Sequence, residues 1–434
     1  MFKIYLLRVF SFALVGSFLV RCTNSSTVLD RALLNSTPAL QEILKEKEKH
    51  EIQILLSQVE RSNTNAIKLK ETSFQLDEMH YFYPASTAKL PVAILALQKL
   101  RTLQSQGIQI DADTPFLIKN KNGDPIIEKD TTHNEGKVTV HHLIKKIFLV
   151  SDNEAYNYLF DFLGRDYINL ELKKRGLSNT QLHHKFLFGA DNTTTWEYIF
   201  LDADQDTLYH QPSLRARLEL KPHSLKGIKK GKGYLNNGNF VEKPMDFSEK
   251  NRISIRDLQG LLQRLIFPSL FSEEQQFEIT EEDYSFLKFW MSRSTLESNY
   301  PNYKDGTYWD SYGKFLIYGD QKGAMTPEIR IYNKVGYAYG TLTDVAYVKE
   351  ASSGIEFFLT ATILVNENGI FNDDQYEFEA QGIPFLAALG RAVLEELKKD
   401  KSHFLSRPKS TKRWCKKSPA KISSYCFGCA ALTV

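Results

Sequence analysis

Strand-like and helix-like apolar patterns occupy different parts of this chain. Three consecutive strands are predicted near the C-terminal end, at about residues 329–335, 343–349 and 355–365. Two more are predicted near the N-terminal end, at 66–70 and 80–83. Helical spacing of apolar residues predicts helices at 39–59, 86–103, 138–163 (interrupted at 151–153), 166–175, 254–266, 281–291 and 383–399. This order predicts an α+β fold: an antiparallel sheet built from both chain ends, flanking helices, and a mostly helical subdomain at about 86–325 inserted between the strands.

The composition supports a globular protein with a large core. The chain has 434 residues, enough for two or three structural units, and 42% of them are hydrophobic. These values exclude a disordered, collagen-like or coiled-coil chain. Four cysteines are too few for a disulfide-held scaffold.

Positive charge is concentrated in one terminal segment. Residues 401–434 contain eight Lys or Arg and no Asp or Glu, and we expect this basic tail to be disordered. Without these eight, the 55 basic residues fall to 47, against 52 acidic ones. The body is therefore mildly acidic, and we expect no nucleic-acid partner.

The first 22 residues have the pattern of an export signal. Lys3 precedes an apolar run, residues 4–20, that is short for a membrane-spanning helix. Cys22 and the polar residues after it suggest a lipoprotein cleavage site, although Arg21 stands where a small residue is usual. We expect an exported protein, in the periplasm or attached to a membrane through its N-terminus; an uncleaved N-terminal anchor is the alternative.

A Ser-x-x-Lys tetrad opens one of the predicted helices. Ser86 follows a predicted strand and begins an apolar helix, so Lys89 lies on the same face one turn later. The free N–H groups at a helix N-terminus would favour a developing anion there. The same spacing recurs in other contexts at Ser285/Lys288, Ser311/Lys314, Ser406/Lys409 and Ser418/Lys421. By itself, the tetrad could be a capping serine with a solvated lysine.

Two further polar motifs interrupt apolar patterns. Residues 151–153, Ser-Asp-Asn, divide a strongly apolar helical region, where they either separate two helices or point into a cleft. Residues 334–336, Lys-Val-Gly, end a predicted strand and continue into a Gly-containing turn and a return strand. The histidine doublets at 141–142 and 183–184 lack metal-site spacing, and we expect no metal and no cofactor.

In this order, the three motifs resemble those of the penicillin-recognising serine hydrolases, specifically class A β-lactamases and their relatives. The flanking patterns Ser-Asp-Asn-x-Ala-x-Asn-x-Leu and Lys-x-Gly-x-x-x-Gly-Thr-x-x-Asp-Val-Ala strengthen the resemblance. It covers about residues 40–397, predicts a hydrolase domain at 39–400, and looks similar to the branch of these enzymes found in Bacteroidetes.

The resemblance implies a role for each motif residue. Ser86 would be the acylated nucleophile, Lys89 in its neutral form would take the proton, and Ser151 would connect the leaving nitrogen with Lys334. These three are the expected catalytic residues.

The expected substrate-binding residues are Asn153, Lys334, Gly336 and Tyr337. Asn153 would bind the side-chain amide of the substrate, and Lys334 would attract its carboxylate. The backbone N–H groups of Ser86 and Tyr337 would form the oxyanion hole.

Two departures from the family pattern bear on turnover. Val335 stands where these enzymes usually have Thr or Ser. The Glu that activates the deacylating water in class A enzymes usually lies 35–40 residues after the Ser-Asp-Asn motif. Residues 183–193 contain no acid except Asp191, and Glu197 is the nearest candidate base.

Three functions remain open on the sequence. The leading one is an acyl-serine hydrolase of β-lactam amides. The second is a peptidoglycan-directed peptidase or esterase that β-lactams acylate and that turns over slowly, as the missing Glu and Thr would favour. The third is a non-catalytic surface protein that binds penicillin-like ligands. We expect a monomer acting on a small β-lactam or a peptidoglycan peptide.

Overall fold

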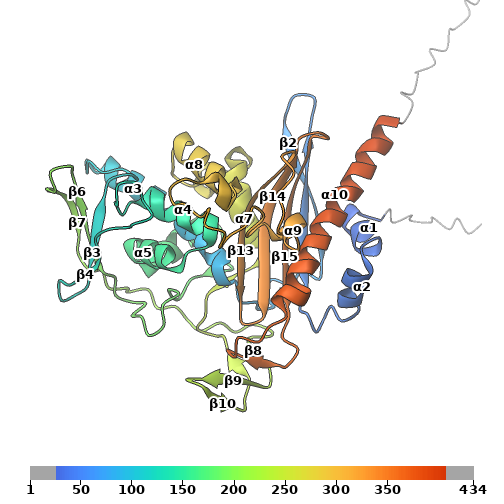
Figure 1. Ribbon diagram of the computed structural model, residues 1–434, viewed down its shortest axis with the longest axis horizontal. Coiled ribbons are helices and arrows are strands. Elements are labelled where there is room, and N and C mark those ends of the chain that lie inside the picture. Colours follow the sequence, from blue (N-terminus) through green and yellow to red (C-terminus); the bar gives the residue numbers. More distant parts are fainter. Residues whose placement is uncertain (1–25, 407–434) are drawn as a thin grey trace, which may run out of the picture.

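A five-stranded antiparallel sheet forms the centre of the protein, whose computed structural model describes residues 26–406. Its strand order is β13-β14-β15-β1-β2, so strands from both chain ends meet in one sheet (Figure 1). The strands are β1 (Gln53–Arg61), β2 (Ile67–Phe74), β13 (Ile329–Ala338), β14 (Thr341–Glu350) and β15 (Ile355–Leu364). The predicted α+β fold is confirmed.

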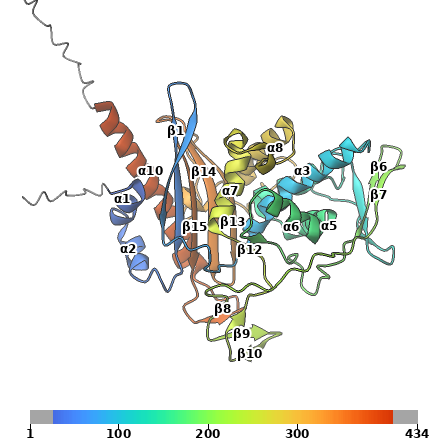
Figure 2. The same ribbon diagram turned by 180° about the vertical axis from the view of Figure 1, so that it is seen from behind.

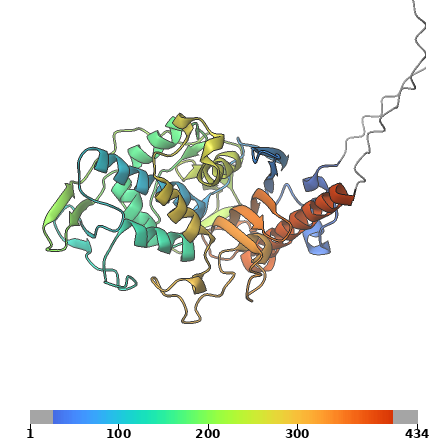
Figure 3. The same ribbon diagram turned by 90° about the horizontal axis from the view of Figure 1, so that it is seen from above.

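Helices cover both faces of the sheet. On one face, the long helix α10 (Ile383–Ser406) packs with α1 (Val28–Leu34) and α2 (Pro38–Lys45). On the other, α7 (Ile255–Ile266) contacts β1, β14 and β15. Figure 3 shows the sheet lying between α10 and the helical part of the protein. Two large apolar cores, one on each side, bury the sheet from water.

The helical subdomain is built around α3, which is buried along almost its whole length. Its neighbours α4, α5 and α6 all contact it. These helices are α3 (Lys89–Ser105), α4 (Val140–Val150), α5 (Asn153–Leu163) and α6 (Arg165–Lys174), with α8 (Glu281–Ser292) packed on α4. Each agrees with a predicted helix.

Short strands form smaller sheets outside the central one. A four-stranded sheet, β4-β3-β6-β7, lies at the end of the helical subdomain farthest from α10 (Figure 1). A three-stranded sheet, β10-β9-β16, projects from the lower side, as the view from behind also shows (Figure 2). Their bounds are β3 (Phe116–Lys119), β4 (Pro125–Ile127), β6 (Glu197–Leu201), β7 (Thr207–Gln211), β9 (Gly233–Asn236), β10 (Asn239–Val241) and β16 (Ile370–Phe371). Two-residue pairs join β8 (Lys229–Lys230) to β11 (Met245–Asp246) and β5 (Thr180–Gln181) to β12 (Arg252–Ile253).

The predicted helix at 39–59 is wrong in its second half. Only α2 forms there, and Gln53 begins the strand β1 between β15 and β2. The first residues of β1 are buried on both faces, so their apolar side chains do not alternate with polar ones. Ile52, Leu55 and Leu56 therefore fall at a spacing that also fits a helix.

The strand predicted at 80–83 does not form. His80 makes an isolated bridge to Lys226, and the next residues are coil. The Tyr81 and Tyr83 rings are buried instead in a cluster with Phe247 and Phe371, and Phe82 packs with Leu55 and Ile255. An aromatic run that anchors a loop has the same local pattern as a short strand.

Some sequence predictions concern residues outside the described range. The export segment with Cys22, and residues 407–434 of the basic tail, lie there. The final helix continues beyond the predicted end at 399 as far as Ser406. Within residues 26–406, we find no helix long and apolar enough to cross a membrane.

Candidate active site

Ser86 lies at the junction between a short 3-10 turn and the buried helix α3. The turn η1 (Ala85–Ala88) passes directly into α3, which begins at Lys89. Ala85 has a positive φ of 46°, an uncommon backbone conformation for a non-glycine residue. Pro91 lies in the first turn of α3, where backbone N–H groups have no intrahelical partner, so its missing N–H is not needed.

Lys89 is fully buried, and its ammonium group faces residues 151–153. Lys89 Nζ donates to Asn153 Oδ1 at 2.6 Å, to Ser151 Oγ at 3.3 Å and to the Ser151 carbonyl. Burial lowers the pKa of Lys89 to about 7, although the charge of Asp152 acts in the opposite direction. A substantial fraction of this lysine is therefore neutral at physiological pH.

The Ser-Asp-Asn triplet both separates two helices and lines the cleft. Ser151 ends α4 in the left-handed conformation, with φ of 59°. Asp152 caps α5 by accepting a hydrogen bond from the Ala155 amide at 2.8 Å. The backbone reversal turns Ser151 and Asn153 toward Lys89.

Lys334 reaches the same point from the sheet. Its Nζ donates to Ser151 Oγ at 2.8 Å and to the Val335 carbonyl at 2.8 Å. Burial lowers the pKa of Lys334 well below its usual value, and the nearby charge of Lys89 lowers it further. Ser151 Oγ is thus bound by two lysines, one from each side of the cleft.

Gly336 allows β13 to lie directly against the turn that carries Ser86. A Cβ atom at this position would lie 2.7 Å from the Ser86 nitrogen and 2.6 Å from the Pro84 carbonyl oxygen. β13 is the edge strand of the sheet, so alternate N–H groups point away from β14. Tyr337, the next residue, is 46% exposed beside Ser86.

Two cavities meet at Ser86. One, of about 220 Å³, is lined by Ser86, Ser151 and Asn153, and by the β13 residues Lys334, Val335 and Tyr337. The other, of about 410 Å³, extends from Ser86 and Asn153 over Phe186 toward aromatic residues and Asp374. The structure therefore brings Ser86, Lys89, Ser151, Asn153, Lys334, Gly336 and Tyr337 together around one cleft.

Phe186 lies beside Lys89, in the stretch of chain where the resemblance led us to look for the deacylating Glu. It lies 35 residues after Ser151, and Lys89 Nζ is 5.3 Å from the centre of its ring. The Phe186 amide donates to Asn157 Oδ1 at 2.7 Å, and the ring stacks on Tyr156. This position is therefore fixed from both the backbone and the side chain.

The candidate base Glu197 lies in a different part of the helical subdomain. It begins β6 in the four-stranded sheet and pairs with His210 at 3.4 Å. It lines neither of the two cavities that contain Ser86. Asp191 is exposed, and one of its carboxylate oxygens accepts hydrogen bonds from the Thr193 and Thr194 amides.

A buried polar network beneath the smaller cavity was not recognised from the sequence. Lys314 Nζ donates to Asn333 Oδ1 at 2.9 Å, and Asn333 Nδ2 donates to Asp344 at 3.0 Å. Burial lowers the pKa of Lys314 to about 8 and raises that of Asp344 to about 6. The sequence indicated a place near the site for Asp344, because Asp344 belongs to the pattern that follows Lys334. It gave no such indication for Lys314, which is part of another Ser-x-x-Lys tetrad.

The chain is similar to several solved structures of β-lactamases. One from Xanthomonas campestris is 14% identical, covers 86% of this chain and 99% of its own, and has a TM-score of 0.47. One from Sphaerobacter thermophilus is 13% identical, covers 83% of this chain and 97% of its own, and has a TM-score of 0.43. One from Desulfarculus baarsii is 14% identical, covers 83% of this chain and 96% of its own, and has a TM-score of 0.45. No curated protein matches the sequence significantly. The profile of the β-lactamase enzyme family matches residues 36–397, most of the chain, and the protein therefore belongs to this family.

Proposed function

We propose that the protein is an acyl-serine hydrolase with Ser86 as its nucleophile and β-lactam amides as its leading substrate class. The observation that carries the proposal is the position of Ser151 Oγ between Lys334 Nζ, at 2.8 Å, and Lys89 Nζ, at 3.3 Å. This arrangement provides a path for a proton from the nucleophile side of the cleft to a leaving nitrogen.

In the first step, neutral Lys89 accepts the hydroxyl proton as Ser86 Oγ attacks the amide carbonyl. The lowered pKa of Lys89 makes this form available near neutral pH. The amides of Ser86 and Tyr337 stabilise the oxyanion, and the close contact permitted by Gly336 holds these two segments together. When the amide bond breaks, the proton passes through Ser151 to the nitrogen.

Asn153 and Lys334 orient the substrate in this scheme. The Asn153 amide already holds Lys89 at 2.6 Å and lines both cavities at Ser86. Lys334 is buried between Ser151 and β13, where a substrate carboxylate would favour its charged form and be bound by it. Val335 beside it supplies no hydroxyl for that carboxylate.

The second candidate is a peptidoglycan-directed peptidase or esterase that releases its acyl group slowly. Phe186 favours it, because an aromatic ring beside Lys89 cannot activate water. The pattern of residues 1–22 supports export of the protein to the periplasm, where such substrates occur. The exported protein would be either free or attached to a membrane through Cys22.

Acylation by a fluorescent penicillin tests both candidates. We expect one adduct, located on Ser86 by mass spectrometry and absent in Ser86→Ala. The variant Ser311→Ala is the matched control, since Ser311 belongs to another Ser-x-x-Lys tetrad. An adduct on Ser311, or labelling that survives in Ser86→Ala, would disprove the assignment. The rate of release separates a true β-lactamase from a slow peptidase.

A further inference from the structure

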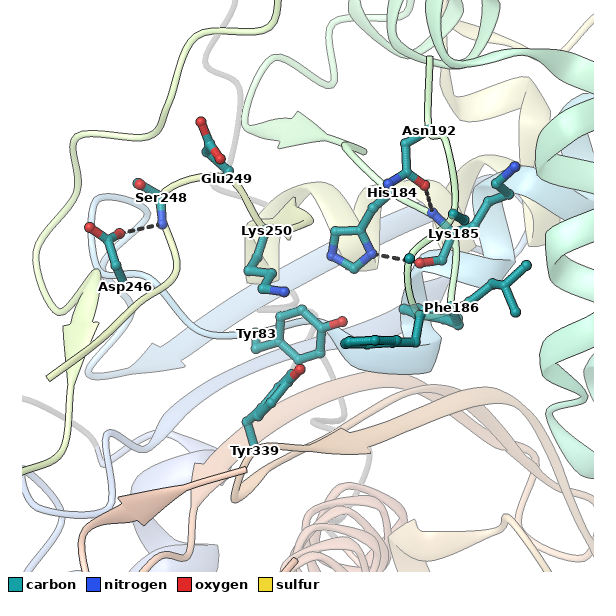
Figure 4. A pocket seen from close by; sticks show the side chains of 14 residues that line it. Tyr83, His184, Lys185, Phe186, Asn192, Asp246, Ser248, Glu249, Lys250 and Tyr339 are labelled. Carbon is teal, nitrogen blue, oxygen red and sulfur yellow. Dashed lines mark hydrogen bonds between the residues drawn. The ribbon is translucent and has the colours of Figure 1, made fainter. Parts of the chain in front are cut away.

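A third cavity continues the cleft away from Ser86. It has a volume of about 770 Å³ and shares Tyr83, Phe186 and Tyr339 with the cavity that contains Ser86 and Asn153. These shared lining residues place the two cavities next to each other. Figure 4 shows the third cavity.

Aromatic residues fix the boundary between the two cavities. The β13–β14 turn has positive φ at both Tyr339 and Gly340, 51° and 70°, as in a tight type I′ hairpin. This turn places the Tyr339 ring edge-on to Tyr83, with centroids 5.1 Å apart, and both rings contact the buried Phe247. The wall is thus rigid and apolar.

Lys250 is the charged side chain that faces this wall. Its backbone is held on both sides, because its amide donates to the Phe247 carbonyl at 3.0 Å and its own carbonyl accepts from His223. Figure 4 shows the side chain directed toward the rings of Tyr83 and His184. Among the described residues, we find no hydrogen bond or ion pair made by Lys250 Nζ. Partial burial lowers its pKa, so an anionic ligand would recover interactions that water no longer provides fully.

The other charged groups of the cavity are engaged elsewhere or lie at its rim. Lys185 Nζ is bound to the buried Asp161 at 2.9 Å. Asp246 accepts from the Ser248 amide at 2.8 Å, and Figure 4 shows Asp246 and Glu249 away from the two tyrosine rings. Burial lowers the pKa of Lys250, and the charge of Glu249 acts in the opposite direction.

His184 does not add a second positive charge. Its Nδ1–H donates to the Lys185 carbonyl at 2.8 Å, which fixes the tautomer. Burial lowers the pKa of His184 to about 4, so the ring is neutral at physiological pH. Among the lining residues that the structure describes, Lys250 is therefore the one cation without an ion pair, and it lies among aromatic rings.

We propose that this outer cavity is a subsite for an elongated acyl group that ends in a carboxylate, with Lys250 as the residue that binds the carboxylate. The inference rests on the proposed function, since the acyl group must be attached to the amide that Ser86 cleaves. It makes Lys250 a specificity-determining residue and peptide-like acyl chains preferred substrates.

The test uses penicillins that share one nucleus and differ only in the acyl chain. Chains of four, six and eight carbons end either in a carboxylate or in its methyl ester, and acylation of Ser86 is timed by mass spectrometry. In the wild type, we expect the chain that reaches Lys250 to react about tenfold faster as the carboxylate than as the ester. In Lys250→Met this ratio should fall to about one, and Lys250→Arg should restore it.

Two controls separate the possible failures. Lys243→Met removes an exposed lysine outside this cavity and should leave the ratio unchanged. Lys250→Glu should reverse the preference toward chains that end in an amine. Equal rates for carboxylate and ester at every length, or a preference that survives in Lys250→Met, would overturn the subsite while leaving the proposed function in place. Failure of every probe to acylate Ser86 would overturn both.

Discussion

Gly336 and Ser86 approach each other so closely that a Cβ on the glycine would lie 2.7 Å from the Ser86 backbone nitrogen. The atoms that it would meet are backbone atoms, which cannot move aside as the end of a flexible side chain can. The edge strand of the sheet and the start of the buried helix α3 are therefore held in one relative position, and the two amides expected to bind the oxyanion depend on it.

Gly336→Ala should therefore greatly reduce acylation while leaving the protein folded. Displacement of either segment removes an oxyanion donor, and loss of one such donor typically costs about 10²–10³ in rate. Stopped-flow acylation by a fluorescent penicillin measures this effect. Gly323→Ala is the control, because no atom lies within 4 Å of its added Cβ. A Gly336→Ala variant that reacts at the wild-type rate would contradict the prediction.

The acylation rate should depend on pH through Lys89. The neutral amine is the reactive form, and its pKa is about 7, so acylation should rise with pH and level off above this value. Below it, the rate should fall about tenfold for each pH unit. Asp152 raises this pKa, so Asp152→Asn should move the rise to lower pH, while the asparagine can still cap α5. A profile that is flat between pH 5 and 8 would exclude Lys89 as the base.

The site motifs could be predicted from the sequence because each is local. Ser86 and Lys89 share one turn, and residues 151–153 form one helix junction, so short spacing determines their geometry. Lys250 and Phe186 could not be assigned in the same way. Their positions depend on how loops between residues 183 and 250 fold against the aromatic cluster around Tyr83, and no local spacing encodes that packing.

The fold was predictable to a similar degree. The C-terminal strands were recognised because they form consecutive hairpins bounded by turns. The strand β1 was missed because a central strand buried on both faces loses the alternation of apolar and polar residues that identifies a strand. Its partner β2, at the edge of the sheet, keeps that alternation; its first half was predicted, and the strand continues to Phe74.

Replacement of Phe186 should change the rate of deacylation. The wild type should show a burst of one product per enzyme followed by a slow phase, because the aromatic ring that lies beside Lys89 cannot activate water. Phe186→Glu would present a general base from a backbone held by Asn157, and such bases typically contribute about 10²–10⁴-fold. Phe186→Gln is the matched control, polar but unable to take a proton. If Phe186→Glu releases the acyl group no faster than Phe186→Gln, this position is not the one that limits deacylation.

Glu197→Gln tests the other candidate base. Glu197 lies on β6 and pairs with His210, outside the cavities at Ser86, so we expect its loss to leave release unchanged. Release of the acyl group after acylation is followed by mass spectrometry. If the substitution slows release several hundred-fold, and the wild type shows no burst, then Glu197 is the base that activates the deacylating water, and the prediction of slow turnover is wrong.

Val335→Thr should act on acylation alone. Val335 lines the smaller cavity next to Lys334, and a threonine there would add a hydroxyl for the substrate carboxylate. A hydrogen bond to a charged group contributes roughly 1.5–3 kcal/mol, which corresponds to about 10- to 150-fold. Because Val335 is only 7% exposed, part of this gain is offset by burying the hydroxyl, and we expect a value near the lower limit.

Val348→Thr, on the buried strand β14 and outside both cavities, should lose stability without gaining rate. In Val335→Thr, the acyl-enzyme lifetime should stay unchanged, since the hydroxyl would contact the carboxylate and not the ester. A variant that both acylates and releases faster would show that Val335 limits turnover by some route other than substrate binding.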